Sequence, residues 1–310
     1  MDCLIEVKDL VKRYRKASIN AVDGVSFDVR AGEFFALLGP NGAGKTTTIS
    51  ILTTTLTPTA GVVKIAGYDA RREAAQVRRQ VGIIFQTPSL DLNLSGEENI
   101  RFHAILYGLY PYRPAYRLMP GEYRRQVLEL AGVLGMAEEV FRPVKKLSGG
   151  MKRKLEIIRG LLHRPRILFL DEPTAGLDAA SRRNLWEYLR RVRAEYDVTI
   201  LLTTHNLDEA EQADRICILD HGKVVALGTP AEVKSQLLEE HLILDAADRD
   251  QLRTELRRLE VDFQETGHFE VHLKGRSAQQ VLRGLKTELT VLRTHSPTLE
   301  DAYLRILAGE

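Results

Sequence analysis

The chain has 310 residues, 44% of them hydrophobic, which is enough for a full α/β core and a smaller second one. Its net charge of +2 gives no reason to expect a nucleic acid partner. It has neither a run of about 20 apolar residues nor, at residues 1–6, the pattern of a secretory leader, so we expect a cytosolic protein. The two cysteines, Cys3 and Cys217, match no metal or disulfide spacing, and we expect both to be reduced and packed.

The first motif along the chain is a glycine-rich segment at 39–46. Its sequence is Gly-Pro-Asn-Gly-Ala-Gly-Lys-Thr, the spacing of a phosphate-binding loop. The apolar run at 34–38 predicts a strand before the loop, and 46–56 predicts a helix after it. Backbone N–H groups of such a turn can wrap a polyanion, and the start of the helix adds a positive dipole. The sequence therefore predicts a nucleotide site here in preference to a glycine-rich turn without a ligand.

Two residues of this loop carry specific roles in the prediction. Lys45 is expected to reach the β- and γ-phosphates and to take part in catalysis, and Thr46 to place its hydroxyl on Mg²⁺. The residues predicted to bind the phosphates are those of the loop and the first helical positions: Gly39, Pro40, Asn41, Gly42, Ala43, Gly44, Lys45, Thr46 and Thr47.

A second apolar run, 167–170, is followed by Asp171 and Glu172. Such a run is typical of a buried parallel strand, and an acid at its carboxyl end lies where open α/β sheets bind ligands. We assign Asp171 to Mg²⁺, directly or through a water, and Glu172 to the base that orients the attacking water. The alternative is a helix N-cap pair before Pro173, which the phosphate loop makes the weaker interpretation.

Segment 147–151, Leu-Ser-Gly-Gly-Met, precedes the second strand and is followed by basic residues. In this position it resembles the signature motif of ATP-binding cassette (ABC) ATPases, and the resemblance covers residues 1 to about 235. It implies an α/β phosphate-loop NTPase fold with a RecA-like core, an antiparallel β subdomain and a helical subdomain at about 87–161.

The resemblance also implies a partner. In the family, the signature of one cassette completes the ATP site of another, a role that falls here to Ser148, Gly149 and Gly150. We therefore expect a homodimer or pseudo-dimer of cassettes that binds ATP and Mg²⁺. The family commonly has Gln where this chain has Met151, and we expect the change to affect helix packing more than binding.

Five further positions take their roles from the same resemblance. Tyr14 resembles the aromatic that stacks on adenine, with half-buried packing as the alternative, and Val22 follows it as a second nucleotide contact. Gln86 resembles the glutamine that touches Mg²⁺ and reports the γ-phosphate to the membrane subunit. Asp178 matches the loop that crosses to the partner cassette, and His205 the switch histidine at the γ-phosphate.

The stretch 106–119 contains Tyr107, Tyr110, Tyr112 and Tyr116 between closely spaced prolines. These prolines predict a break in the helix. Exposed tyrosines would suit an interface with a membrane subunit, and a self-packed loop is the equal alternative.

Residues 240–310 predict a second domain after the cassette at 1–235. Strand patterns at 241–245, 261–263, 269–274 and 289–292 alternate with helical patterns at 249–259 and 278–285. The order is βαββαβ, which predicts a small α+β, ferredoxin-like domain. A last helix is expected after Pro297, with Thr298 as its cap.

This tail resembles the C-terminal extension of exporter ATPases of the daunorubicin-resistance and sodium-extrusion types. It implies an ATP-hydrolysing subunit on the cytoplasmic face of the membrane, paired with separate integral membrane permease subunits that export a drug, lipid, polymer or ion. An importer ATPase is the nearer alternative, although its tail is usually a β-barrel. Soluble cassettes of DNA repair, chromosome organisation and translation are disfavoured, because the chain has no coiled-coil or zinc insertion and no second cassette.

Overall fold

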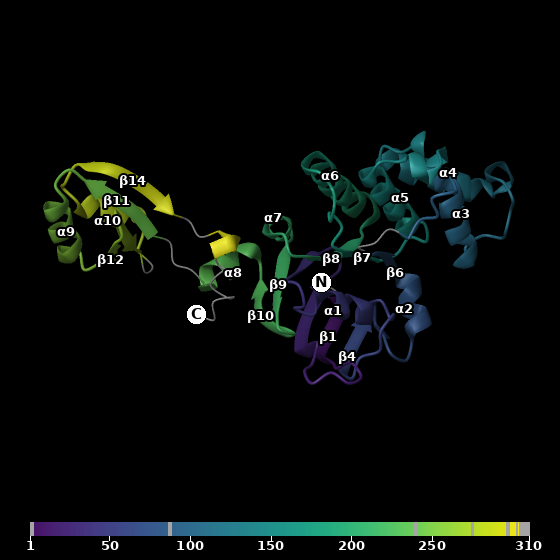
Figure 1. Ribbon diagram of the computed structural model, residues 1–310, viewed down its shortest axis with the longest axis horizontal. Helices are drawn as coiled ribbons and strands as arrows, with labels where there is room; N and C mark the ends of the chain where they lie inside the picture. Colours follow the sequence, from purple (N-terminus) through teal and green to yellow (C-terminus); the bar gives the residue numbers. More distant parts are fainter. Residues whose placement is uncertain are drawn as a thin grey trace. The chain divides into compact units, whose positions relative to one another are not determined.

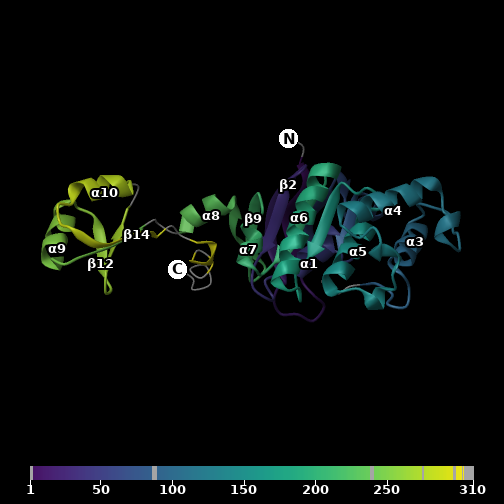
Figure 2. The ribbon, with the colours of Figure 1, turned by 90° about the horizontal axis from the view of Figure 1, so that it is seen from above.

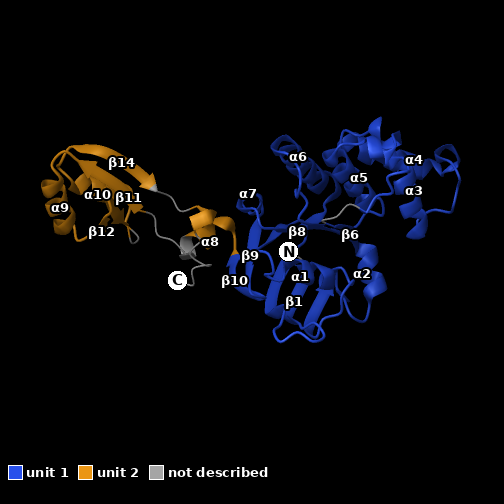
Figure 3. Ribbon diagram, viewed as in Figure 1, with its two compact units in different colours: residues 1–227 blue, residues 228–310 orange. Residues whose placement is uncertain are grey.

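The computed structural model describes residues 3–85, 89–237, 241–273, 276–295, 298–301 and 303. The chain forms two compact units, Met1–Leu227 and Gly228–Glu310 (Figure 3). The second unit begins with helix α8 (Pro230–Leu237), which the sequence pattern assigns to the end of the cassette; the boundary between 235 and 240 stays a prediction. Within the part of the chain that the structure describes, no helix combines the length and apolar character needed to cross a bilayer.

The centre of unit 1 is a six-stranded sheet. Its order is β10 (Lys223–Gly228), β9 (Arg215–Asp220), β3 (Phe34–Leu38), β8 (Thr199–Thr204), β7 (Ile167–Asp171) and β6 (Val81–Ile84). The five strands from β9 to β6 run parallel, and every residue of β3, β7 and β8 is buried. Their apolar runs therefore bring the carboxyl ends of β3, β7 and β8 to the same edge of the sheet.

A second, antiparallel sheet covers this core. Its order is β2 (Val22–Arg30), β1 (Cys3–Lys12), β4 (Ala60–Ile65) and β5 (Tyr68–Asp69). Phe27 of β2 stacks on Phe35 of β3 with ring centroids 5.3 Å apart, so the two sheets share one hydrophobic core. Helices α1 (Lys45–Leu52) and α2 (Ala74–Gln80) also contribute buried side chains to this core.

The remaining helices of unit 1 carry the signature and its surroundings. In Figure 1 and Figure 2, α3 (Gly96–Leu106), α4 (Gly121–Val133) and α5 (Gly149–Leu161) gather at one end of the unit. Helices α6 (Ala179–Tyr196) and α7 (Leu207–Ala210) follow β7 and β8. Short 3₁₀ turns lie at Tyr116–Leu118, Glu139–Phe141 and Val144–Lys146.

The tyrosine-rich stretch 106–119 agrees in part with each interpretation, an exposed interface and a self-packed loop. The expected helix break is present, because α3 ends at Leu106 and only a 3₁₀ turn follows before α4. Tyr110 and Tyr116 pack edge-on against the buried Tyr123, at 5.4 and 6.3 Å between ring centroids. Tyr107 and Tyr112 instead keep 45% and 60% of their surface exposed. The stretch is thus partly self-packed and partly available for a partner.

After α8, unit 2 continues in the order βαββαβ and has its own core. The elements are β11 (His241–Ala246), α9 (Arg249–Arg258), β12 (Asp262–Glu265), β13 (Phe269–His272), α10 (Ala278–Gly284) and β14 (Leu289–His295). The strands lie in the order β12-β13-β11-β14 with every neighbour antiparallel, which is the ferredoxin-like arrangement. The predicted cap is also present: the N–H of Asp301 donates to Thr298 Oγ1 at 3.1 Å.

Two local predictions from the sequence are wrong. The prediction that both cysteines are packed fails for Cys3, which is exposed because it is the first residue of β1 and the buried residues of that strand begin at Leu4. It holds for Cys217, which is fully buried and whose pKa is raised to about 12 by desolvation. The helix expected over 46–56 ends at Leu52, where the backbone turns and Thr54 adopts a positive φ of 62°.

Candidate nucleotide site

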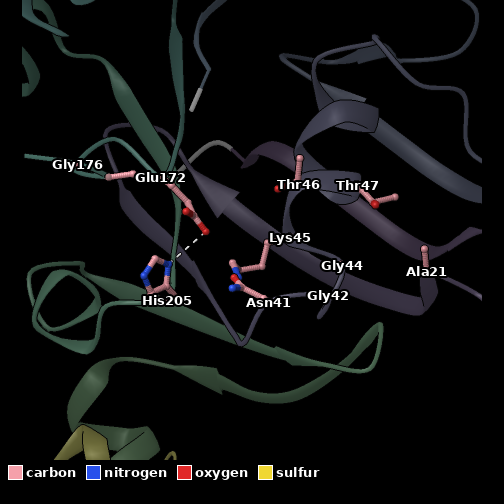
Figure 4. Close-up of a pocket in the computed structure, with 11 residues that line it drawn as sticks. Ala21, Asn41, Gly42, Gly44, Lys45, Thr46, Thr47, Glu172, Gly176 and His205 are labelled. Atoms are coloured by element: carbon pink, nitrogen blue, oxygen red, sulfur yellow. Dashed lines mark hydrogen bonds and ion pairs between the residues drawn. The ribbon is translucent and has the colours of Figure 1, made fainter. Parts of the chain in front are cut away.

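A cavity of about 700 Å³ opens where β3, β7 and β8 end (Figure 4). Its lining comes from four separate stretches of the chain: Ala21, Asn41, Gly42, Gly44, Lys45, Thr46, Thr47, Glu172, Ala175, Gly176 and His205. The fold thus brings the phosphate loop together with Glu172 and His205, as the sequence predicts.

Two glycines are required for the shape of the loop. Gly44 has φ +102°, and a Cβ there would lie 2.5 Å from the carbonyl oxygen of Ala21. A Cβ on Gly39 would lie 2.3 Å from the carbonyl oxygen of Leu219. Val22 is fully buried, and its Cγ2 would lie 3.5 Å from a Cβ on Gly44. Its side chain therefore packs against the loop and does not line the cavity.

Lys45 is a buried cation at the floor of this loop. Its Nζ donates to the carbonyl oxygens of Gly39 at 2.7 Å and Pro40 at 2.9 Å. Burial lowers the pKa of the lysine, while the charges of Glu172 and Asp171 act in the opposite direction. A desolvated ammonium beside a backbone cradle that a single Cβ would fill fits a polyphosphate.

The two acids at the end of β7, Asp171 as its last residue and Glu172 directly after it, are hydrogen-bonded to β8. The Thr203 hydroxyl donates to Asp171 Oδ1 at 2.5 Å, and the N–H of Glu172 donates to the carbonyl and hydroxyl oxygens of Thr203 at 3.2 and 3.1 Å. Glu172 adopts φ +44°, a left-handed conformation that turns the chain sharply at the end of the strand. Asp171 is 6% exposed and close to the floor of the site, whereas Glu172 lines the cavity. No motif singles out Thr203; its only signal is a hydroxyl at the end of an apolar strand.

Glu172 and His205 face each other in the cavity (Figure 4). Glu172 Oε1 lies 3.2 Å from His205 Nδ1, although the residues come from the ends of different strands. The histidine side chain is 57% exposed and the glutamate 12%, so a water or phosphate can reach both. A carboxylate and an imidazole at hydrogen-bond distance can orient a nucleophilic water.

Tyr14 lies beside the phosphate loop. Its hydroxyl is 3.2 Å from Thr47 Oγ1, Lys12 Nζ is 5.6 Å from its ring centroid, and the residue is 46% exposed. The ring is therefore accessible next to the site, and its stacking on adenine stays a prediction. Gln86 falls outside the described residues.

The signature lies in a different cavity, of about 140 Å³, whose lining includes Ser148, Gly150 and Met151. The Ser148 hydroxyl caps α5 by accepting from the N–H of Met151 at 3.2 Å, and Asp178 caps α6 by accepting from the N–H of Ser181 at 2.8 Å. The Ser181 hydroxyl also donates to Asp178, at 2.7 Å, and the two bonds hold the pKa of Asp178 below its usual value. The two cavities share no lining residue, so Ser148, Gly150 and Met151 of the signature do not line the cavity that the phosphate loop lines.

Comparison with known proteins identifies the family. A family model described as ABC transporter matches residues 22–175. Daunorubicin/doxorubicin resistance ATP-binding protein DrrA of Streptomyces peucetius is 42% identical over 256 residues, which is 82% of this chain and 74% of that protein. The chain belongs to the ABC transporter family. Nod factor export ATP-binding protein I of Ralstonia nicotianae is 36% identical over 316 residues, covering 99% of this chain and 94% of its own.

Solved structures agree with this assignment. An ATP-binding cassette bound to ADP and Pi, in a dimeric post-hydrolysis state, matches with a TM-score of 0.63 and 29% identity over 73% of this chain and 98% of its own. As a member of this ABC family, the chain binds and hydrolyses ATP. The predicted cassette fold and ATPase activity are thereby confirmed.

Proposed function

We propose that this chain is the ATPase subunit of an exporter, in which two cassettes enclose two ATP molecules and drive separate membrane subunits. The proposal that two chains are needed rests on one observation: the residues predicted to contact ATP line two separate cavities. Glu172, His205 and the phosphate loop share one cavity, while Ser148 and Gly150 lie in another. A second copy would supply the missing half, with the cap of α5 aimed at phosphate.

The residues of the chain have separate tasks in this reaction. Lys45 and the loop N–H groups bind the polyphosphate, and Glu172, aligned by Thr203, orients the water, with His205 holding the carboxylate from the other side. Thr46, Asp171 and Gln86 would hold Mg²⁺, which neutralises phosphate charge when bound. Catalysis then depends mainly on positioning.

Export rests on the tail and on the relatives. The relative whose name refers to Nod factor export aligns with nearly the whole chain, including the second unit. That unit is an α+β sheet domain, whereas the importer alternative is usually associated with a β-barrel. The exposed Tyr107 and Tyr112 offer contacts for a membrane subunit, which would place the protein on the cytoplasmic face of the membrane.

Two measurements test the proposal. The Glu172→Gln variant should bind ATP and accumulate as a dimer in size-exclusion chromatography, and adding Ser148→Ala should reduce that dimer, because the donor to phosphate is lost. A variant that stays monomeric at saturating ATP would contradict the two-chain scheme. Tagged protein recovered from gently solubilised membranes should carry a permease; recovery with a binding-protein-dependent importer, or only with soluble protein, would overturn export.

A further inference from the structure

The signature helix α5 carries a buried arginine that no motif explains. Arg153 lies two residues after the signature, and its side chain is 5% exposed. It forms an ion pair with Glu156, whose side chain is 1% exposed, at 3.0 Å between Nη1 and Oε2. Burial of both charges is costly unless their hydrogen bonds are used, so the remaining contacts of the pair matter.

The guanidinium of Arg153 donates to three backbone carbonyls of the catalytic core. Nε donates to Pro173 at 2.9 Å and Nη2 to Asp171 at 3.3 Å, which are the residues on either side of Glu172. Nη1 donates to Phe85 at 2.5 Å, the residue before Gln86. One side chain therefore bonds to the residues on both sides of Glu172 and to the residue that follows β6.

Glu156 extends the same network to the other side of Gln86. Its Oε1 accepts from the N–H of Ser89 at 3.0 Å, and Arg159 of the same helix donates to the carbonyl and hydroxyl oxygens of Ser89 at 2.8 and 2.6 Å. Phe85 and Ser89 are thus both tied to α5. Helix α5 bonds directly to the segments before and after Gln86 as well as to the flanks of Glu172.

We propose that Arg153, held in place by Glu156, is a positioning residue for ATP hydrolysis that aligns Glu172 of its own chain from the signature helix. Glu172 has a strained backbone, with φ +44°, and such a conformation persists only where its surroundings fix it. The Thr203 bonds fix the N–H of Glu172, and the Arg153 bonds fix the carbonyls before and after it. An error in the direction of this carboxylate lowers the rate of hydrolysis without affecting the phosphate loop, which binds the nucleotide.

The test compares two buried arginines of the same region. In the control, Arg101 pairs with Glu97 at 3.2 Å, with side chains 7% and 4% exposed, and donates to the carbonyl of Arg113 rather than to the catalytic core. We expect Arg153→Gln to lower kcat about 100-fold while KM and nucleotide affinity stay within about twofold. Arg101→Gln should lower the melting temperature comparably, with kcat per folded protein retained. Equal kcat losses in the two variants would make Arg153 merely structural and overturn the proposal.

Two more variants keep the test independent of folding. Arg153→Lys should restore part of kcat, because one ammonium can reach only some of the three carbonyls. The double variant Arg153→Met with Glu156→Leu removes both charges and should fold, since apolar replacement of a buried pair is often neutral. It should still have the low kcat, and a wild-type kcat there would contradict the positioning role.

Heterodimers of differently tagged chains decide which ATP site Arg153 serves, and this step rests on the proposed two-chain function. With Arg153→Gln in one chain and Glu172→Gln in the other, the only intact glutamate lies beside the altered arginine, and hydrolysis should be slow. With both changes in one chain and the other wild type, hydrolysis should be about half that of the wild-type dimer. The reverse pattern would overturn positioning within the chain, since it would show that Arg153 acts through the partner's site. If wild-type protein hydrolyses ATP without dimerising, the two-chain function fails, while the kcat comparison still tests Arg153.

Discussion

Replacing Gly44 by alanine tests the steric argument for the phosphate loop, with Gly42 as its matched control. Both glycines have positive φ, +102° and +85°, but only the Gly44 Cβ would meet another atom, the carbonyl oxygen of Ala21 at 2.5 Å. No heavy atom lies within 4 Å of the corresponding Gly42 position among the described residues. Gly42→Ala therefore carries only the left-handed strain of about 1–2 kcal/mol. Gly44→Ala adds a backbone overlap of about 1–3 kcal/mol.

The assay is thermal unfolding of the nucleotide-free protein, which separates loop strain from contacts with ATP. For a unit of this size, 1 kcal/mol corresponds to about 2–4 °C in Tm. Gly42→Ala should lower the Tm of unit 1 by about 2–8 °C, and Gly44→Ala by several degrees more. Equal shifts in the two variants would refute the argument from close approach, because the overlap would then be relieved without cost.

Three further changes have defined outcomes. Thr203→Val removes the hydroxyl that bonds both strand-end acids and should lower kcat at least about tenfold. Thr199→Val removes another fully buried hydroxyl, which accepts from the N–H of Gly32, and should lower stability without lowering kcat. Equal kcat values in the two variants would contradict the role of Thr203. Met151→Gln should leave the ATPase rate within about twofold, because the contact of residue 151 with Ser148 is through its backbone N–H; a large change would refute the packing interpretation. Deletion of 241–310 should leave nucleotide binding intact, since unit 2 has its own core, but reduce the dimer fraction measured by light scattering; an unchanged fraction would exclude a dimer contact in the tail.

Much of the site could be predicted because its chemistry is local in the sequence. The phosphate loop, the acids at the end of β7 and the signature are short contiguous segments whose residue types match what a phosphate, a metal or a helix start requires. The apolar patterns of the tail likewise predicted its elements in order. A strand buried on one face alternates apolar and polar residues, and a strand buried on both faces is a continuous apolar run, so either pattern can be recognised from consecutive residues. Family resemblance supplied what spacing alone could not, such as the role of His205.

Only the tertiary structure decided which distant residues meet. The bonds of Thr203 to Asp171 and Glu172, and of Arg153 to the flanks of Glu172, join residues brought together by parallel strand pairing and by packing of α5, which no local pattern encodes. The same is true of the separation of Ser148 from Lys45 into different cavities. Sequence by itself determined the chemical groups and the elements that carry them. The distances between these groups and the directions of their side chains depend on long-range packing. These distances and directions decide whether the groups can act together on the same phosphate.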